Sequence, residues 1–198
     1  MSEMEVTEEK ITEIDGEQAV VTVTKPGEFV VCNLASLSLG RIDVNNREEL
    51  SEITKTAVRA LDNVIDLNFF PVPYAKINNE KYRPIGLGVS GYHHMLAKNE
   101  IPWESEEHLA FAERVFAEIH YAAVEASAEL AREKGCYTYF EGSKWQTGEY
   151  FAERHLTEDR WKKLAKKGRR ENGMRKWVSD GDRADGKYKY DCRNDSGD

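Results

Sequence analysis

Cysteine is scarce in this sequence, which has three copies, Cys32, Cys136 and Cys192, among 198 residues. They are too few and too scattered for the disulfide framework that stabilises small secreted domains. No C-x-x-C pair occurs, so a structural zinc site has no support. In a reducing compartment a lone cysteine is usually a small buried hydrophobe, and this is the first interpretation of each thiol.

Long hydrophobic runs are also absent. No apolar stretch approaches the roughly 20 residues that a membrane-spanning helix needs. The opening residues, MSEMEVTEEK, are acidic and lack the apolar core of a signal peptide. Hydrophobic residues make up 40% and charged residues 32%, which is typical of a soluble globular domain. We therefore expect a cytoplasmic protein.

Several signatures of catalytic and cofactor sites are missing, among them G-x-S-x-G, G-x-x-x-x-G-K-[ST] and H-E-x-x-H. GLGVSG (86–91) has the spacing of a dinucleotide-binding turn, but no second βαβ unit follows it. Close packing of backbone where a strand meets a helix is the favoured explanation. His93 and His94 would point about 100° apart on a helix, and His120 has no ligand partner at i+4. We interpret all three histidines as structural, and we predict no metal site.

The net charge of −8 is unevenly distributed. Residues 160–177 hold nine Lys or Arg against one Glu. Such a block could bind nucleic acid or another polyanion, which would suit a non-enzymatic module. A solvated helix face is the favoured alternative, because the block is short and its aromatic residues are only Trp161 and Trp177.

Two strands are predicted near the start of the chain. QAVVTVT (18–24) is rich in β-branched residues, and FVVCNL (29–34) is a more apolar run. The turn KPGE (25–28) separates them, so they are expected to form a hairpin. Residues 1–16 are polar and are expected to be poorly ordered.

Helical spacing of apolar residues dominates the rest. A helix is predicted over 44–67, with Asn45 or Asn46 as its cap, and a longer one over 103–135, capped by Ser105. Residues 74–91 are expected to be a connection and a short apolar piece. Shorter helices are predicted from near Ser90 and over 157–168. The expected buried stripe of the longest helix comprises Leu109, Ala112, Val115, Phe116, Ile119, Ala123, Ala126 and Leu130.

Five segments carry a family resemblance. They are VVCNLASLSLGRID (30–43), ALDNVIDLNFFPVP (60–73), RPIGLGVSGYHHML (83–96), WESEEHLAFAERVFAEIHYAAVEASAELA (103–131) and YFEGSKWQTGEYF (139–151). Together they resemble the catalytic (large, alpha) subunit of class I ribonucleotide reductase, of bacterial and phage type. The resemblance implies an α/β fold: a partial segment of the family's ten-stranded α/β barrel, mainly helical in this fragment with a few short strands.

The resemblance also implies a role for Cys32. The family reduces ribonucleoside diphosphates to deoxyribonucleotides: a cysteine thiyl radical abstracts the ribose 3′-hydrogen, and a cysteine pair supplies two electrons and becomes a disulfide. The cysteine of VCNLASL is one member of that pair, so Cys32 is expected to be a redox-active disulfide partner. Cys136 and Cys192 match none of the family's redox cysteines, and Cys136 is interpreted as structural.

The resemblance runs from about residue 28 to about Arg175. It divides the chain into a polar lead-in with the first strand (1–27), a partial catalytic barrel (28–175) and an atypical tail, expected to be disordered (176–198). The family's radical cysteine and phosphate-binding segments are not found in this chain, so we expect a fragment that is inactive alone. The implied partners are other fragments of the large subunit, a radical-generating small (beta) subunit, a thioredoxin- or glutaredoxin-type reductant and the diphosphate substrate. The metal/radical cofactor would belong to the small subunit, and nucleotide effectors would bind elsewhere.

Overall fold

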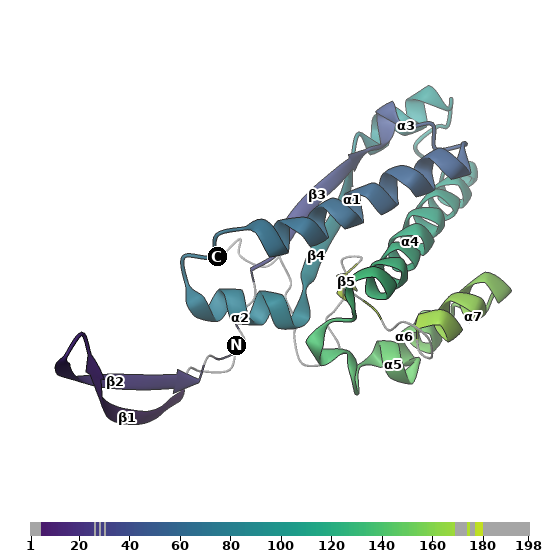
Figure 1. The fold of residues 1–198 in the computed structure, drawn as a ribbon. Helices are drawn as coiled ribbons and strands as arrows, with labels where there is room; N and C mark the ends of the chain where they lie inside the picture. The colour runs from purple at the N-terminus through teal and green to yellow at the C-terminus, as the bar shows by residue number, and fades with distance from the viewer. Residues whose placement is uncertain are drawn as a thin grey trace.

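The computed structural model describes residues 5–25, 27, 29, 31–168, 174 and 177–179. Two separate sheets and seven α-helices are present in these residues (Figure 1). Cys192 and most of the expected tail lie outside the described residues.

The chain begins with a β-hairpin that projects from the helical body (Figure 1). Strand β1 (Glu5–Ile14) pairs antiparallel with β2 (Glu17–Lys25). Asp15 and Gly16 form the turn with φ of 53° and 85°, the left-handed values that two-residue hairpin turns require. The strand predicted over 18–24 is confirmed. The expectation that 1–16 is poorly ordered is wrong for the described part, because an Asp-Gly turn signal outweighs a polar composition.

A three-stranded parallel sheet lies at the centre of the body. Its order is β3 (Asn33–Ser38), β4 (Pro84–Ser90) and β5 (Trp177–Ser179). The predicted strand over 29–34, and its hairpin with 18–24, are therefore wrong: pairing starts at Asn33, and the partner of β3 is β4. The strand β5 also lies inside the segment expected to be a disordered tail.

Two long helices pack together beside this sheet (Figure 1). They are α1 (Arg47–Leu67) and α4 (Glu106–Lys134). Their ion pairs join Arg47 to Glu118, Lys55 to Glu125 and Glu129, and Arg59 to Glu133. Because the numbers rise together along both helices, α1 and α4 run parallel. Parallel strands followed by parallel helices are the arrangement of successive βα units, which agrees with a partial α/β barrel.

The caps of the two long helices were predictable. The Asn46 side chain accepts a hydrogen bond from the Glu49 amide at 3.2 Å, and the Ser105 hydroxyl accepts one from the His108 amide at 3.1 Å. The buried stripe of α4 is confirmed for Val115, Ile119, Ala123, Ala126 and Leu130. It is wrong for Leu109 and Phe116, which are 70% and 40% exposed. Those side chains lie in the first half of α4, whereas most buried residues of the helix lie between Ile119 and Ala131.

The shorter helices complete the body. Helix α2 (Pro73–Tyr82) was missed by the sequence interpretation, because its polar residues give no apolar stripe. Helix α3 (Tyr92–Lys98) follows β4, and η1 (Leu39–Arg41) follows β3. After α4 come η2 (Thr138–Phe140), α5 (Lys144–Thr147), α6 (Glu149–Glu153) and α7 (Asp159–Lys166). Buried aromatic residues hold these last helices against α4, among them Tyr137, Phe140, Trp145, Tyr150, Phe151 and Trp161.

Candidate active site around Cys32

Cys32 lies immediately before β3 and is exposed, and it is not in a disulfide. Its Sγ is 3.9 Å from the Asn33 carbonyl oxygen. A Cβ placed on Gly86 of β4 would lie 3.5 Å from this Sγ. The thiol therefore sits beside a position of the neighbouring strand that carries no side chain. A strand-end thiol with open access can exchange with a second thiol or with an external reductant.

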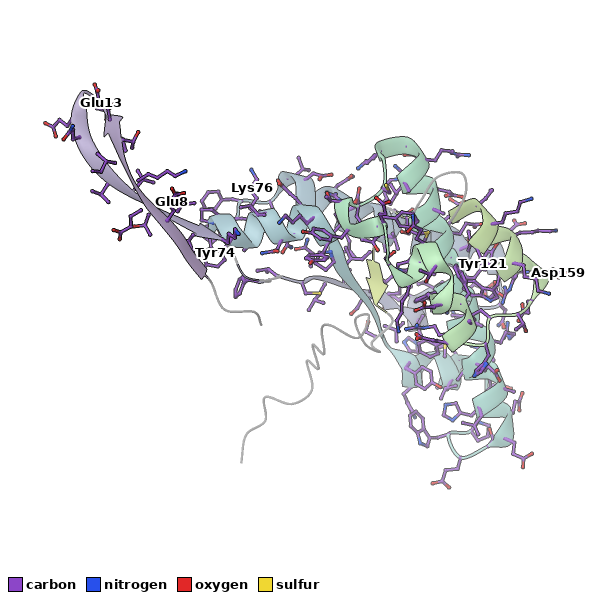
Figure 2. The ribbon with its side chains drawn as sticks, turned by 90° about the horizontal axis from the view of Figure 1, so that it is seen from below. Glu8, Glu13, Tyr74, Lys76, Tyr121 and Asp159 are labelled. Atoms are coloured by element: carbon purple, nitrogen blue, oxygen red, sulfur yellow. The ribbon has the colours of Figure 1, made fainter. Side chains whose placement is uncertain are left out.

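The backbone before Cys32 is held by helix α2. Asn79 makes two hydrogen bonds to the backbone of Val31, and Asn78 donates one to the Gly27 carbonyl. Figure 2 shows Tyr74 on the same helix; its ring packs edge-on against Phe29, with centroids 5.5 Å apart. The sequence interpretation missed these residues. The signal was present as two adjacent asparagines in a polar helix, but their targets lie 48 and 51 residues away.

The end of α2 is fixed by a buried ionic cluster. Arg83 follows α2 with φ of 49°, and its side chain is 5% exposed. Its guanidinium contacts the carboxylates of Asp62 and Asp66 at 2.8 and 2.7 Å. Lys134 of α4 reaches the other oxygen of Asp62 at 2.9 Å. The cluster therefore ties α1, α4 and the start of β4 together.

Cys136 does not fit its interpretation as a buried structural thiol. It follows the Gly135 cap of α4 and is exposed. The reason is its position: the helix ends at Lys134, and the neighbour that turns into the core is Tyr137, which is 4% exposed. Cys192, the third cysteine, lies outside the described residues.

The glycine pattern at 86–91 has a packing explanation. Gly86 and Gly88 lie within β4, and Gly91 caps the seven-residue helix α3 with φ of 68°. A Cβ on Gly91 would come within 3.3 Å of the Gly40 amide nitrogen. Gly86 thus lies close to Leu34 of β3, and Gly91 allows α3 to approach the segment after β3, as the packing interpretation predicts.

The histidines lie in different surroundings. His93 and His94 are exposed on α3, whereas His120 of α4 lies 2.7 Å from the Tyr150 hydroxyl. His108 stands between Tyr92 and Trp103, with its Nε2 2.5 Å from the Tyr92 hydroxyl oxygen. In the part of the chain that the structure describes, no group of three or more His, Cys, Asp or Glu side chains could hold a metal ion.

The basic block is partly folded into the body. Helix α7 buries Trp161, and its Arg160 pairs with Glu118 and Glu158. Lys162 pairs with Asp159, which Figure 2 labels on the same helix. Residues 169–173, 175 and 176 of the block lie outside the described residues. The described half therefore favours a solvated, ion-paired helix face over a polyanion site.

Comparison with known proteins settles the family. The sequence model of the ribonucleotide reductase barrel domain matches residues 9–178. This chain belongs to the ribonucleotide reductase family. The fold and the partial-barrel interpretation are thereby confirmed, and the match also includes most of the hairpin and most of the strand β5. No described helix is long and apolar enough to cross a membrane.

Three curated relatives show how much of a reductase the chain represents. It is 57% identical over 164 residues to the ribonucleoside-diphosphate reductase subunit alpha of Treponema pallidum, covering 83% of this chain and 19% of the relative. It is 47% identical over 126 residues to the Helicobacter pylori subunit alpha, covering 64% and 16%. It is 41% identical over 138 residues to large chain 2 of Saccharomyces cerevisiae, covering 65% and 16%. The chain thus spans less than a fifth of the length of these reductase subunits.

Proposed function

We propose that this chain forms the part of a ribonucleoside-diphosphate reductase barrel that carries one of the two reductant cysteines, Cys32. The observation that carries the proposal is the thiol immediately before β3, within VCNLASL, exposed beside Gly86. The relatives are named ribonucleoside-diphosphate reductases, and the chain shares 41–57% of its residues with them over the matched lengths.

The chemistry balances as a dithiol reduction. Cys32 and a second cysteine, supplied by another part of the large subunit, give up two electrons and two protons and form one disulfide. The ribose of the diphosphate takes these up as its hydroxyl group leaves as water. A dithiol reductant of the thioredoxin or glutaredoxin type then restores both thiols by disulfide exchange, a reaction that needs the open access seen at Cys32.

The remaining parts of the enzyme belong to the same proposal. The chain would act with other parts of the large subunit, in the cytoplasm, and with a small subunit that holds the metal and radical cofactor. The radical cysteine, the phosphate-binding turn and the effector sites would come from segments other than those described. Without these other parts, the chain would not catalyse the reduction.

The test is a hybrid enzyme. Residues 9–178 replace the matching segment of the Treponema pallidum subunit alpha, and deoxyribonucleotide formation is measured with a thioredoxin-type reductant. Cys32→Ser should abolish multiple turnover without preventing assembly, because a serine hydroxyl cannot form the disulfide. Cys136→Ser, the matched control at another exposed cysteine, should leave turnover unchanged. Full multiple turnover by the Cys32→Ser hybrid would refute the assignment.

A further inference from the structure

We propose that helix α2 is a clasp that fixes the position of the Cys32 thiol, with Asn79 as its central positioning residue. The clasp comprises Tyr74, Asn78 and Asn79. The inference rests on the proposed function, because it concerns the same thiol. Helix α2 itself carries no reacting group, and its role is to fix the position of that thiol.

Asn79 makes the closest contact of the clasp with the chain before Cys32. Its side chain is fully buried. Its Oδ1 accepts from the Val31 amide at 2.9 Å, and its Nδ2 donates to the Val31 carbonyl at 2.5 Å. One side-chain amide thus satisfies both backbone groups of the residue that precedes Cys32. A neighbouring strand would offer the same pair of bonds in a sheet.

The rest of the clasp holds the chain further upstream. Asn78, 3% exposed, donates through Nδ2 to the Gly27 carbonyl at 2.8 Å. Tyr74 packs against Phe29. The contacts fall on residues 27, 29 and 31, and those to Gly27 and Val31 are hydrogen bonds to backbone groups. Side chains of one helix therefore hold the chain before β3 at three points.

The course of the chain explains why a helix, and not a strand, contacts the residues before Cys32. Strand β4, the neighbour of β3, begins at Pro84, and a proline has no N–H with which to extend the ladder. Arg83, with φ of 49°, turns the chain from α2 into β4. The pairing of β3 starts at Asn33 opposite Ile85. Gly27 and Val31 lie before that point, so the asparagines supply the partners that β4 does not.

Position matters for a thiol that must meet a second thiol. A disulfide requires Cβ atoms about 3.5–4.5 Å apart, so a small displacement of the backbone at Cys32 removes the reacting geometry. The clasp fixes the residue before Cys32, and the ladder fixes the residue after it. Cys32 is thereby held between two anchors, beside Gly86, which the Leu34 side chain also approaches.

A disulfide trap measures this position without any turnover. Gly86→Cys is introduced into the complete chain, because a Cβ there would lie 3.5 Å from the Cys32 Sγ. That Cβ would also come within 2.5 Å of the Leu34 side chain, which is 74% exposed and free to rotate away. Oxidised glutathione takes two electrons from the two thiols, giving one intramolecular disulfide and two molecules of glutathione. Mass spectrometry across a series of glutathione buffers gives the equilibrium constant.

Three asparagine variants are compared in this background. Asn79→Ala should lower the equilibrium constant for the disulfide at least tenfold, because the backbone at Val31 loses both anchors. Asn79→Asp keeps an acceptor for the Val31 amide and loses the donor. Its equilibrium constant should therefore lie between that of the chain with Asn79 and that of Asn79→Ala. Asn99→Ala is the matched control: its amide also donates to a backbone carbonyl, that of Met95 at 2.8 Å, but it follows α3 at the far end of β3 from α2 (Figure 1). It should leave the constant unchanged.

Two results would overturn the clasp. One is an unchanged constant in an Asn79→Ala chain whose circular dichroism is native. The other is loss of fold in both Asn79 variants, which would assign the asparagine to folding in place of positioning. The proposed function and the clasp can fail independently. The disulfide trap is measured without any turnover, and the Cys32→Ser hybrid tests the thiol whether or not α2 positions it.

Discussion

The ionic cluster at Arg83 offers the sharpest test of how the site is supported. Arg83 donates to the Asp62 carboxylate through Nε and a terminal nitrogen, at 3.0 and 2.8 Å, and to the Asp62 carbonyl at 3.1 Å. Asp62 is fully buried. Burial lowers the pKa of Arg83, but hydrogen bonds to Asp66 and Asp62 raise it, and the net shift is upward. Removing Arg83 would leave a buried carboxylate with Lys134 as its remaining charged partner of the cluster.

The expected cost follows from that burial. Breaking a buried ion pair by removing one partner costs about 3–5 kcal/mol. Domains are stable by only about 5–15 kcal/mol in total. With a urea dependence of about 2 kcal/mol per M, Arg83→Met should lower the unfolding midpoint by roughly 2 M. Because the folded pKa of Arg83 is raised, its contribution is fully present below its unfolded pKa, so the loss should be the same throughout the neutral range.

Urea unfolding followed by circular dichroism measures this loss. Arg59→Met is the matched control, since Arg59 pairs with Glu133 between the same two helices but both side chains are more than two-fifths exposed. Exposed pairs contribute little, so this variant should shift the midpoint far less. If Arg83→Met and Arg59→Met shift the midpoint equally, the reasoning from burial is refuted.

Two further outcomes are expected. Burial lowers the pKa of Lys55, but hydrogen bonds and charges of Glu125 and Glu129 raise it by more. The stability that Lys55 gives is therefore complete below its unfolded pKa and is lost as pH rises through the higher folded value; alkaline unfolding curves of Lys55→Met should lack this loss, and identical curves would contradict it. Gly91→Ala should cost about 1–2 kcal/mol for the left-handed backbone, in addition to crowding against the Gly40 amide nitrogen. Gly88→Ala in the adjacent strand, where a Cβ makes only ordinary contacts, is its control in thermal unfolding, and equal costs would argue against backbone strain.

Local signals in the sequence predicted the long helices well. Asn46 and Ser105 cap α1 and α4 as expected, and Glu48 and Glu49 occupy the first turn of α1. A helix cap and an apolar repeat each involve residues that are close together in the sequence. They can therefore be recognised without knowledge of the fold. The Asp15-Gly16 turn is equally local, and its hairpin was missed because polar composition was given more weight than turn chemistry.

The candidate site was only partly predictable. Cys32 was identified through its motif, but the structure places it immediately before β3 and not within the strand predicted over 29–34. Its reductant role stays a prediction. Asn79 and Arg83 could not be found in this way, because their partners Val31 and Asp62 lie 48 and 21 residues away. Cys136 was misassigned because, just after the end of a helix, a shift of one residue decides whether a side chain faces the core or the solvent. An apolar pattern does not locate side chains to within one residue.

Motifs, caps and periodicity are properties of neighbouring residues, so the family, the helical segments and the cysteine most worth testing follow from the sequence alone. The parallel course of α1 and α4, the pairing of β5 with β4, and the hold of helix α2 on the chain before Cys32 became evident from the fold. These contacts depend on the path of the whole chain. A buried amide or guanidinium must find partners somewhere in the fold, and which residues supply them is set by packing that no local pattern encodes.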